Sequence, residues 1–449
     1  MTTTVDTPPV VTGFVPSAQQ AEGVAKVVDW YTNDPVAAGQ PVFRLFGFAG
    51  TGKTSVAQHI VAESGAERVL YAAYTGKAAY VLRTKGAEDA STVHSLIYSP
   101  VDKVRARLRH LQEELERCTD PAERAVLEQQ IAREEDRLAS PDFVLREESE
   151  LAGADLLVLD EVSMIGERVA ADLLAWGTPI LCLGDPAQLP PVDGGGYFIN
   201  APADHLLTEI HRSALNSPVT RLATTVRNAP VGAWQYGITG SDGDSGRIDR
   251  LAVDELLGID QVLVGTNKTR WQMIHLLRAL TGRVNPLPVS GDRIIVIANS
   301  GEAGVFNGQQ FTVDSARPAA RDDQILLSVT GDDGEQRDMA CWTDGFVGGV
   351  EGEKRARRDG RGTVVAATFG QAITVHKSQG SQWDSVLVVD ESQVFADGAR
   401  RDAKRAGRRA EAAREAHLAG QRWLYTAITR AAQRAVIVPG ITGLLGGVA

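Results

Sequence analysis

The sequence is poor in cysteine and lacks long apolar runs, and both shortages exclude classes of protein. Its 449 residues include only three cysteines, Cys118, Cys182 and Cys341, which form no CxxC pair. They predict neither a disulfide framework nor a zinc site, and a reduced, cytoplasmic setting is the simplest interpretation. No run of about 18 apolar residues is present, so we expect no membrane span. The first residues, MTTTVDTPPVVTGF, lack the basic start and apolar stretch of a signal peptide.

Basic charge is also scarce for a protein that would bind nucleic acid. The chain has 46 Lys and Arg against 57 Asp and Glu, a formal net charge of −11. This balance is weak evidence against nucleic-acid binding, because binding depends on local patches rather than on the total charge. A DNA-binding hypothesis must therefore rest on motifs. The hydrophobic content of 43% is ordinary for a globular protein, and the length predicts roughly two to four domains.

Short apolar runs that alternate with helical patterns indicate the fold class. Near-continuous apolar strands of this kind are typical of parallel sheets covered on both faces. The runs fall into an early and a late cluster, which predicts an α/β fold with two such domains. They lie at 42–48, 68–74, 155–161, 178–185, 261–266, 364–369, 385–391 and 434–438.

Three stretches depart from this alternation. Residues 101–138 carry Leu, Val and Ile at helical spacing among charges, with a break at TDP (119–121), so we expect a helical hairpin inserted in the first α/β domain. Residues 287–363 resemble short strands with Gly and Asp turns, which predicts a small β insert in the second. Residues 395–422, rich in Ala, Arg and Glu, favour a solvated helix with i,i+4 ion pairs, although phosphate contact stays open.

The segment GFAGTGKT at 47–54 predicts a nucleotide site. It follows an apolar run and precedes a helical stretch, the context that a phosphate-binding P-loop requires. Glycines let backbone N–H groups surround phosphates at a helix N-terminus, where the helix dipole favours anions. Lys53 would reach the β- and γ-phosphates, and the Thr54 hydroxyl would bind Mg²⁺.

A second apolar strand, in LLVLDEVSM at 156–164, ends in two carboxylates. Asp160 would hold Mg²⁺ and Glu161 would polarise the attacking water, because phosphoryl transfer depends on positioning and charge neutralisation. Such a pair is a weak signal alone. About a hundred residues after a P-loop it is a strong one.

Further motifs follow in order over nearly the whole chain. GDPAQLPPV at 184–192, LTEIHRS at 207–213, TFGQAITVHKSQG at 368–380 and LYTAITRA at 424–431 resemble motifs III to VI of superfamily 1B helicases, the RecD-like and Dda-like enzymes. This resemblance implies two RecA-like P-loop domains with parallel sheets, plus a helical insert and a small β-barrel-like insert. The domains it implies are 1A (1–98 and 152–206), 1B (99–151), 2A (207–286 and 364–449) and 2B (287–363).

The resemblance also implies roles for individual residues around ATP. Gln188 would sense the γ-phosphate, and Arg212 and Arg430 would reach it from the second domain as arginine fingers. PSAQQAEGV at 16–24 resembles the Q motif that reads adenine; Gln20 fits its spacing better than Gln19, and S-x-x-Q is equally a helix capping box. The full set of expected nucleotide contacts is Gln20, Gly47, Gly50, Thr51, Gly52, Lys53, Thr54, Ser55, His211 and Gln382.

The same resemblance implies a track for DNA along strand-to-helix turns, where open α/β sheets bind ligands. Hydroxyls, lysines and helix N-termini suit phosphate contacts, which carry no sequence information. Trp383, after motif V, is the aromatic residue we consider first for base stacking. The expected DNA contacts are Thr75, Lys77, Thr92, His94, Thr374, His376, Lys377 and Ser378.

The leading hypothesis is an ATP-dependent DNA helicase that moves 5′→3′ on single-stranded DNA and unwinds duplex. Its expected cofactors are ATP and Mg²⁺, and its partners single-stranded DNA and single-strand/duplex junctions, with replication or recombination proteins also possible. We expect a monomer. By position, 99–151 corresponds to the insert that carries the strand-separating pin, although here it is largely helical. The alternatives are a DNA translocase or clamp without unwinding, and a RecD-like motor subunit of a larger complex.

Overall fold

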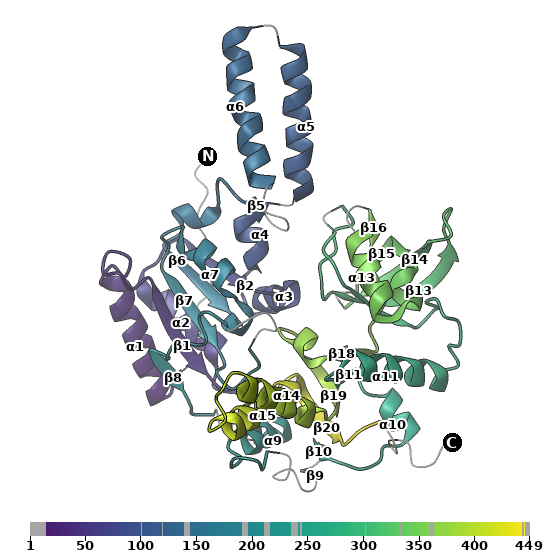
Figure 1. Cartoon of the computed structure of the whole chain (residues 1–449). Coiled ribbons are helices and arrows are strands. Elements are labelled where there is room, and N and C mark those ends of the chain that lie inside the picture. Colours follow the sequence, from purple (N-terminus) through teal and green to yellow (C-terminus); the bar gives the residue numbers. More distant parts are fainter. Residues whose placement is uncertain are drawn as a thin grey trace.

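The structure is a computed structural model of the chain and shows two α/β domains with two inserts (Figure 1). The described residues are 15–99, 101–118, 120–138, 144–190, 196–210, 216–234, 241–242, 245–300, 302–332, 334–359, 363–441 and 444. Within these ranges, no helix is both long and apolar enough to cross a bilayer.

The first α/β domain is built on a six-stranded parallel sheet in the order β3-β2-β6-β7-β1-β8. Helices α1 and α2 cover one face and α4 and α7 the other, which explains why its central strands are almost entirely apolar. The strands are β1 (Val42–Gly47), β2 (Val69–Ala73), β3 (Ser91–Thr92), β6 (Leu156–Asp160), β7 (Ile180–Gly184) and β8 (His205–Leu207). The helices are α1 (Ala18–Thr32), α2 (Lys53–Ser64), α3 (Gly76–Thr84), α4 (Val93–Ile97) and α7 (Glu167–Leu174), with 3₁₀ turns at Glu150–Gly153 and Val162–Met164.

The second α/β domain has a six-stranded sheet in the order β18-β11-β19-β20-β10-β9, parallel except for the β9–β10 pair. Its strands are β9 (Ser241–Asp242), β10 (Ser245–Arg247), β11 (Gln261–Val264), β18 (Ala372–Thr374), β19 (Trp383–Val389) and β20 (Ala431–Val438). Its helices are α9 (Pro218–Arg227), α10 (Val253–Leu257), α11 (Asn267–Leu280), α14 (Ser392–Arg405) and α15 (Ala412–Ile428), with a 3₁₀ turn at Val375–Ser378. The polar 395–422 segment is therefore the end of a helical hairpin, α14–α15.

The β insert forms a third sheet, in the order β16-β15-β14-β13-β12-β17. Its edge strands, β16 and β17, are separated by one residue, so the chain passes directly from one edge to the other and the sheet nearly closes. The sheet thus extends to residue 369, past the boundary expected at 363. Its elements are β12 (Arg293–Val296), β13 (Gln310–Pro318), β14 (Gln324–Gly331), β15 (Gln336–Trp342), β16 (Val364–Val365), β17 (Ala367–Phe369), α12 (Asp344–Val347) and α13 (Gly349–Asp359).

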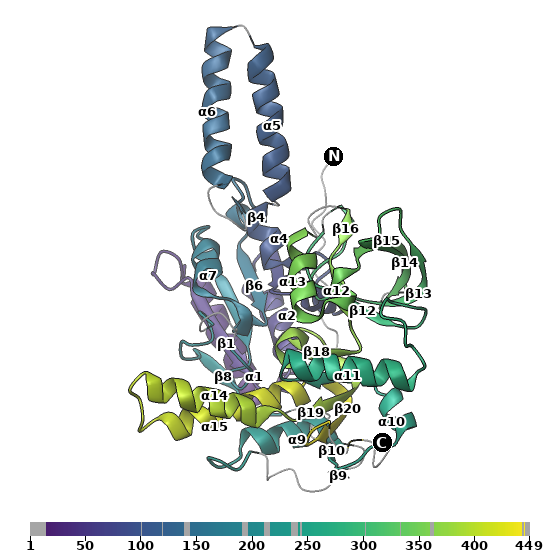
Figure 2. The same ribbon diagram turned by 45° about the vertical axis from the view of Figure 1, so that its right-hand side comes forward.

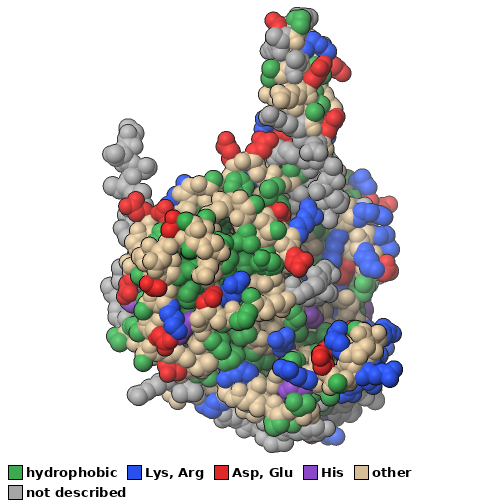
Figure 3. Space-filling model, turned by 60° about the vertical axis from the view of Figure 1, so that its left-hand side comes forward, with side chains coloured by type: hydrophobic (Ala, Val, Ile, Leu, Met, Phe, Trp, Pro, Cys, Tyr) green, Lys and Arg blue, Asp and Glu red, His purple; other side chains and the backbone are tan. Residues whose placement is uncertain are grey.

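The helical insert is an antiparallel hairpin, α5 (Val101–Arg117) and α6 (Pro121–Leu138), that stands clear of the rest of the molecule (Figure 2). Acidic and basic side chains both occur on the face of this projection that Figure 3 shows. At its base, β4 (Tyr98–Ser99) pairs with β5 (Val144–Leu145), so the hairpin leaves and rejoins the domain at one place. Few of its described side chains are buried, among them Leu111 and Glu134.

The fold class expected from the sequence is confirmed. All eight apolar runs contain strands, and residues 101–138 form the helical hairpin. One hydrophobic cluster joins the second sheet to the β insert, with Leu387 and Val389 packing in the same core as Ile294 and Phe311. This shared core fixes the β insert against the second domain and so positions the surface between them.

Candidate functional site

The P-loop lies between the end of β1 and the start of α2. Gly50 and Gly52 have φ angles of +81° and +77°, which residues with a side chain rarely adopt. Glycine is therefore required to turn the backbone toward the helix N-terminus. The Lys53 ammonium donates to the carbonyl oxygens of Gly47 (2.8 Å) and Phe48 (3.2 Å) and therefore lies at the mouth of this loop.

The remaining expected P-loop contacts occupy the loop and the first turn of α2. Thr51 is buried, and its hydroxyl donates to the Phe48 carbonyl at 2.9 Å. Thr54 and Ser55 follow Lys53 in the first helical turn and are half-buried. The arrangement is an anion-binding helix start with a lysine beside it.

Gln20 is buried against the P-loop. Its side-chain N–H donates to the Thr51 carbonyl at 3.0 Å, and its side-chain oxygen accepts from the Ser17 N–H at 2.9 Å. Ser17 accepts in turn from the Gln20 backbone, so the capping box is present. Gln19 instead bonds the backbone of Thr208 and Glu209 after β8. Of the two glutamines, Gln20 is therefore the one that contacts the loop.

Asp160 and Glu161 lie at the carboxyl end of β6, beside β7 and one strand from β1. Glu161 has a φ angle of +54°, unusual for a residue with a side chain, and its N–H donates to the Asp160 carboxylate at 2.8 Å. Such strained positions cost about 1–3 kcal/mol and cluster at functional sites. Burial and the neighbouring Glu161 charge raise the pKa of Asp160 to about 6, and the Lys53 charge opposes the rise.

Tyr425, in the motif VI helix α15, connects the two α/β domains at the P-loop. Its hydroxyl accepts from the Ala49 N–H at 2.9 Å and donates to the buried Asp185 carboxylate at 2.7 Å. Burial raises the pKa of Asp185. Motifs I, III and VI therefore meet in one chain of hydrogen bonds.

A second connection runs through Leu189, which is buried among side chains of the second domain. Its N–H donates to the Thr426 hydroxyl at 2.9 Å, and its carbonyl accepts from the Gln379 side chain at 2.9 Å. Gln379 belongs to motif V. Movement of the GDPAQL segment would therefore be transmitted to both motif V and motif VI.

The other residues expected around the γ-phosphate lie near these connections. Gln188 is buried, and its side-chain oxygen has no hydrogen-bond partner in the described structure. Arg430, also buried, donates to the carbonyls of Thr426 and Ser381 at 3.3 Å, and Gln382 is exposed next to Ser381. His211 and Arg212 lie outside the described residues.

The motifs alone assign no role to Tyr425, Asp185, Gln379 or Arg227. The first three lie inside the motif segments, but only the fold shows that their side chains form hydrogen bonds with other motif segments. The Arg227 guanidinium, at the end of α9, lies 3.7 Å from the centre of the Phe48 ring, a contact from the second domain to the P-loop. Nothing in the sequence around Arg227 indicates this contact.

A pocket of about 830 Å³ lies where the first domain, the second domain and the β insert meet. Four of the eight expected DNA contacts line it: Thr75, Thr374, His376 and Lys377. Its other walls include Asn267 and Arg270 of α11 and Lys354 and Arg357 of α13, none of which the sequence indicated. Lys77 and Thr92 line an adjacent pocket between α3 and the β insert.

The expected DNA-binding threonines lie at strand-to-helix turns, where they cap helices. Thr75, Thr92 and Thr374 accept hydrogen bonds from the N–H groups of the first turns that follow. They thereby orient helix N-termini, which suit phosphate contacts. Ser378 is fully buried and donates to the Val375 carbonyl at 2.8 Å, so its side chain presents no surface to the pocket.

The remaining expected contacts are already engaged within the protein. The Lys77 ammonium is 3.4 Å from Asp332 of the β insert and 4.6 Å from the centre of the Trp383 ring. Trp383 is mostly buried beneath it. His94 packs between Tyr74 and Tyr98, and burial lowers the pKa of its imidazole.

Lys377 has the most strongly shifted pKa among the residues that line the larger pocket. Burial, together with the positive charges of Arg357 and Arg270, lowers its pKa to about 7, and Glu353 opposes this effect. Glu353 is itself buried and paired with Arg270 and the Thr368 hydroxyl. The pocket therefore concentrates positive charge in a protein of net negative charge.

Comparison with known proteins is consistent with these motifs. A family model of the AAA domain matches residues 31–235. The ATP-dependent RecD2 DNA helicase of Deinococcus radiodurans is 30% identical over 375 residues, which cover 78% of this chain and 43% of that protein. The chain thus spans less than half the length of this curated relative.

Similar solved structures include two Pif1 helicases. That of Candida albicans has a TM-score of 0.48 and 16% identity and covers 94% of each chain. Bacteroides Pif1, solved bound to single-stranded DNA, has a TM-score of 0.46 and 16% identity, covering 94% of this chain and 92% of its own. By the AAA-domain match and the RecD2 similarity, with the motifs in order along the sequence, the chain is similar to the RecD-like superfamily 1B helicases.

Proposed function

We propose that this protein is an ATP-driven motor that moves 5′→3′ along single-stranded DNA and unwinds duplex. The observation that carries the proposal is the pair of hydrogen-bonded connections between the P-loop, the GDPAQL segment and motifs V and VI. Motif V also lines the pocket that contains half of the expected DNA contacts. One set of elements therefore serves both nucleotide and DNA. The 5′→3′ direction rests on the family resemblance.

In this proposal the P-loop binds the ATP phosphates through its backbone N–H groups, and Lys53 turns from its own loop carbonyls to the β- and γ-phosphates. Glu161 orients the attacking water. Arg430 and Arg212 neutralise charge on the γ-phosphate from the second domain, a contribution worth roughly 10³–10⁵ in rate in other NTPases. Because these arginines come from across the cleft, cleft closure depends on the nucleotide state.

The residues present fit a Mg²⁺ ion at the nucleotide. A carboxylate whose pKa is raised by burial and by a neighbouring carboxylate, as for Asp160, is stabilised by a cation. Thr54 and Asp160 would hold the ion, which would neutralise phosphate charge. Among the described residues no group of three or more acidic, His or Cys side chains forms a metal cage. Proteins bind Mg²⁺ through one or two carboxylates together with substrate phosphates.

The DNA strand would cross the pocket between the domains, with its phosphates near Lys377, Arg357 and the helix starts capped by Thr75 and Thr374. A change in cleft closure moves the GDPAQL segment, and through Gln379 it moves motif V against the strand. Hydrolysis is thereby converted to motion along DNA. Single-strand/duplex junctions are the expected substrates, and the monomer is the expected working unit.

ATP hydrolysis with and without single-stranded DNA tests the proposal. Hydrolysis should be strongly stimulated by DNA, and Lys53→Ala should abolish it while circular dichroism shows the fold intact. Lys26→Ala, at an exposed lysine paired with Glu22 on α1, is the matched control and should retain full activity. Glu161→Gln should keep ATP binding but stop turnover. Retained turnover in Lys53→Ala would show that the site is assigned wrongly.

A further inference from the structure

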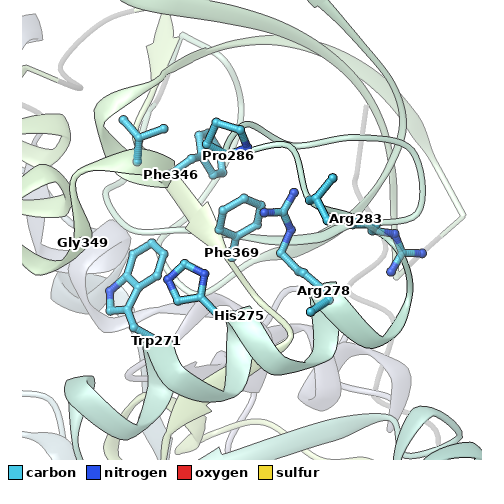
Figure 4. Close-up of a pocket in the computed structure, with 11 residues that line it drawn as sticks. Trp271, His275, Arg278, Arg283, Pro286, Phe346, Gly349 and Phe369 are labelled. Carbon is cyan, nitrogen blue, oxygen red and sulfur yellow. The ribbon is translucent and has the colours of Figure 1, made fainter. Parts of the chain in front are cut away.

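A second hollow lies beside the DNA pocket, between α11 and the β insert (Figure 4). It has a volume of about 570 Å³, within the range of small-molecule sites in proteins. None of the motifs contributes to it except through Phe369 at the start of motif V. Aromatic rings form much of its surface: Trp271, His275, Phe346 and Phe369.

The rings form two pairs, one on α11 and one on the β insert. Trp271 and His275 project from successive turns of α11, with ring centres 5.7 Å apart and planes inclined by 35°. Phe346 and Phe369 meet edge to face on the opposite side of the hollow, and both are almost fully buried (Figure 4). The Trp271 indole N–H is buried without a hydrogen-bond partner in the described structure. A flat ring placed here would gain stacking on these aromatic side chains.

Two arginines, Arg278 and Arg283, line the hollow, and its described lining includes no Asp or Glu. Arg278 is paired with Asp292 through two contacts of 3.0 Å. Arg283 lies at the outer rim with its guanidinium turned outward (Figure 4). It donates to the Thr281 hydroxyl and lies 4.0 Å from Asp292, and these two partners leave further guanidinium N–H groups available. The hollow thus suits a flat ring linked to an anion.

The hollow adjoins the DNA pocket along two elements. On α11, Asn267 and Arg270 line the DNA pocket, and the next residue, Trp271, begins the wall of the hollow. At the start of α13, Gly349 lines the hollow and Val350 the DNA pocket. A strand that leaves the DNA pocket over α11 therefore reaches the aromatic hollow.

We propose that this aromatic hollow binds one nucleobase at one end of the single-stranded DNA, stacked on Trp271 and His275, with the adjoining phosphate at Arg283. The inference rests on the proposed function, because it presupposes a strand in the adjacent pocket. The site holds one end of the strand beyond the pocket that the motifs define. It reads no sequence, because stacking accepts every base.

This proposal is tested with a series of single-stranded oligonucleotides of increasing length, extended separately at each end. The affinity of the protein for each oligonucleotide is measured. Extension at one end only should add a discrete step in affinity when the strand reaches the hollow. The step should be roughly fivefold to a hundredfold, the range expected for one stacked base. A single abasic nucleotide moved along the longest oligonucleotide should remove the step at one position.

Substitutions then assign the step to the hollow. Trp271→Ala and His275→Ala should remove the step and the abasic effect together, while affinity for the shorter oligonucleotides stays unchanged. Arg283→Gln should reduce the step, and Arg250→Gln, at an exposed arginine outside the hollow, should not. Because His275 is exposed, its substitution tests the site even if Trp271→Ala fails to fold.

The possible failures are distinguishable. If no oligonucleotide binds, the proposed function fails, and this site with it. If short oligonucleotides bind but the step is absent, or survives in both Trp271→Ala and His275→Ala, the aromatic hollow is not a base site. Binding of an acidic peptide that depends on Trp271, with no change in the DNA series, would assign the hollow to a protein partner instead and overturn the proposal.

Discussion

Tyr425 shows how one side chain can couple the two α/β domains. It is almost fully buried, and its hydroxyl is bonded on one side to the P-loop backbone and on the other to Asp185. Burial and the Asp185 charge raise the pKa of its hydroxyl well above the usual value, so the group stays a neutral donor. The Tyr425 hydroxyl itself therefore does not lose its proton at physiological pH.

Tyr425→Phe should weaken this coupling. The change leaves the Ala49 N–H without this partner and removes one of the donors to the Asp185 carboxylate, which keeps the Ala187 N–H. An unsatisfied buried group costs about 1–3 kcal/mol. We expect a lower free energy of unfolding by about that amount, and a larger loss in DNA-stimulated than in basal ATP hydrolysis. Tyr197→Phe, at an exposed tyrosine of the first domain, is the control. Unchanged DNA stimulation in Tyr425→Phe would show that the link carries no signal.

Lys377 predicts a pH dependence of DNA affinity. With a pKa of about 7, it is charged below pH 7 and largely neutral above it, and only the charged form attracts phosphate. Affinity for single-stranded DNA should therefore rise as pH falls through about 7. Lys377→Arg, which stays charged, should flatten the profile and retain tight binding at pH 8. His376, whose pKa is lowered by burial, stays neutral in this window. An identical pH profile in wild type and Lys377→Arg would contradict the assignment.

Among the elements, the α5–α6 hairpin is the one whose structure the sequence predicts well and whose function it predicts least. Helical spacing and the break before Pro121 were sufficient to define both helices, because the pattern is local. Its described contacts are also local, such as the Arg107–Glu134 ion pair and the bonds from Arg124 to the carbonyls of Leu115 and Cys118. Nothing in this pattern identifies what the projecting hairpin contacts.

Replacing residues 101–138 by a short flexible linker should separate DNA-stimulated ATP hydrolysis from the opening of duplex DNA. The β4–β5 pair brings the two ends of the hairpin together, so the first domain should fold without it. If the hairpin separates strands, DNA-stimulated hydrolysis and single-strand binding should persist while unwinding of a tailed duplex is lost. Unwinding at the wild-type rate after the replacement would exclude this role.

Helices α12 and α13 were not predicted, and the reason is physical. Gly345, Gly348, Gly349 and Gly352 disfavour helix locally, and the segment between the strands resembled turns. Tertiary contacts override this preference: a Cβ at Gly345 or Gly352 would approach a backbone oxygen to 2.0–2.1 Å, so close packing requires glycine there. The buried Arg270–Glu353 pair then fixes α13 to α11.

On the scale of the whole molecule, the sequence was most informative where function depends on contiguous motifs. The P-loop and the Asp160–Glu161 pair were found from local pattern alone, and the parallel sheets place them together. The contacts between domains were not predictable, because Ala49 and Tyr425 are 376 residues apart in the chain. Likewise, the pairing of Lys77 with Asp332 depends on how the β insert lies against the first domain.

In the function we propose, these long-range contacts make the motor a property of the assembled molecule. The P-loop alone would bind nucleotide, and the pocket between the domains would hold DNA. Only the connections through Leu189 and Tyr425 relate the two. The central claim is therefore that ATP hydrolysis at the P-loop drives directed movement on DNA.

The most direct test is ATP-dependent unwinding of two matched duplexes, one with a 5′ single-stranded tail and one with a 3′ tail. Our account predicts that only the 5′-tailed duplex is opened, and that Lys53→Ala opens neither. Opening only from the 3′ tail would keep the motor but contradict its direction. DNA-stimulated hydrolysis with neither duplex opened would contradict unwinding and indicate a translocase or clamp.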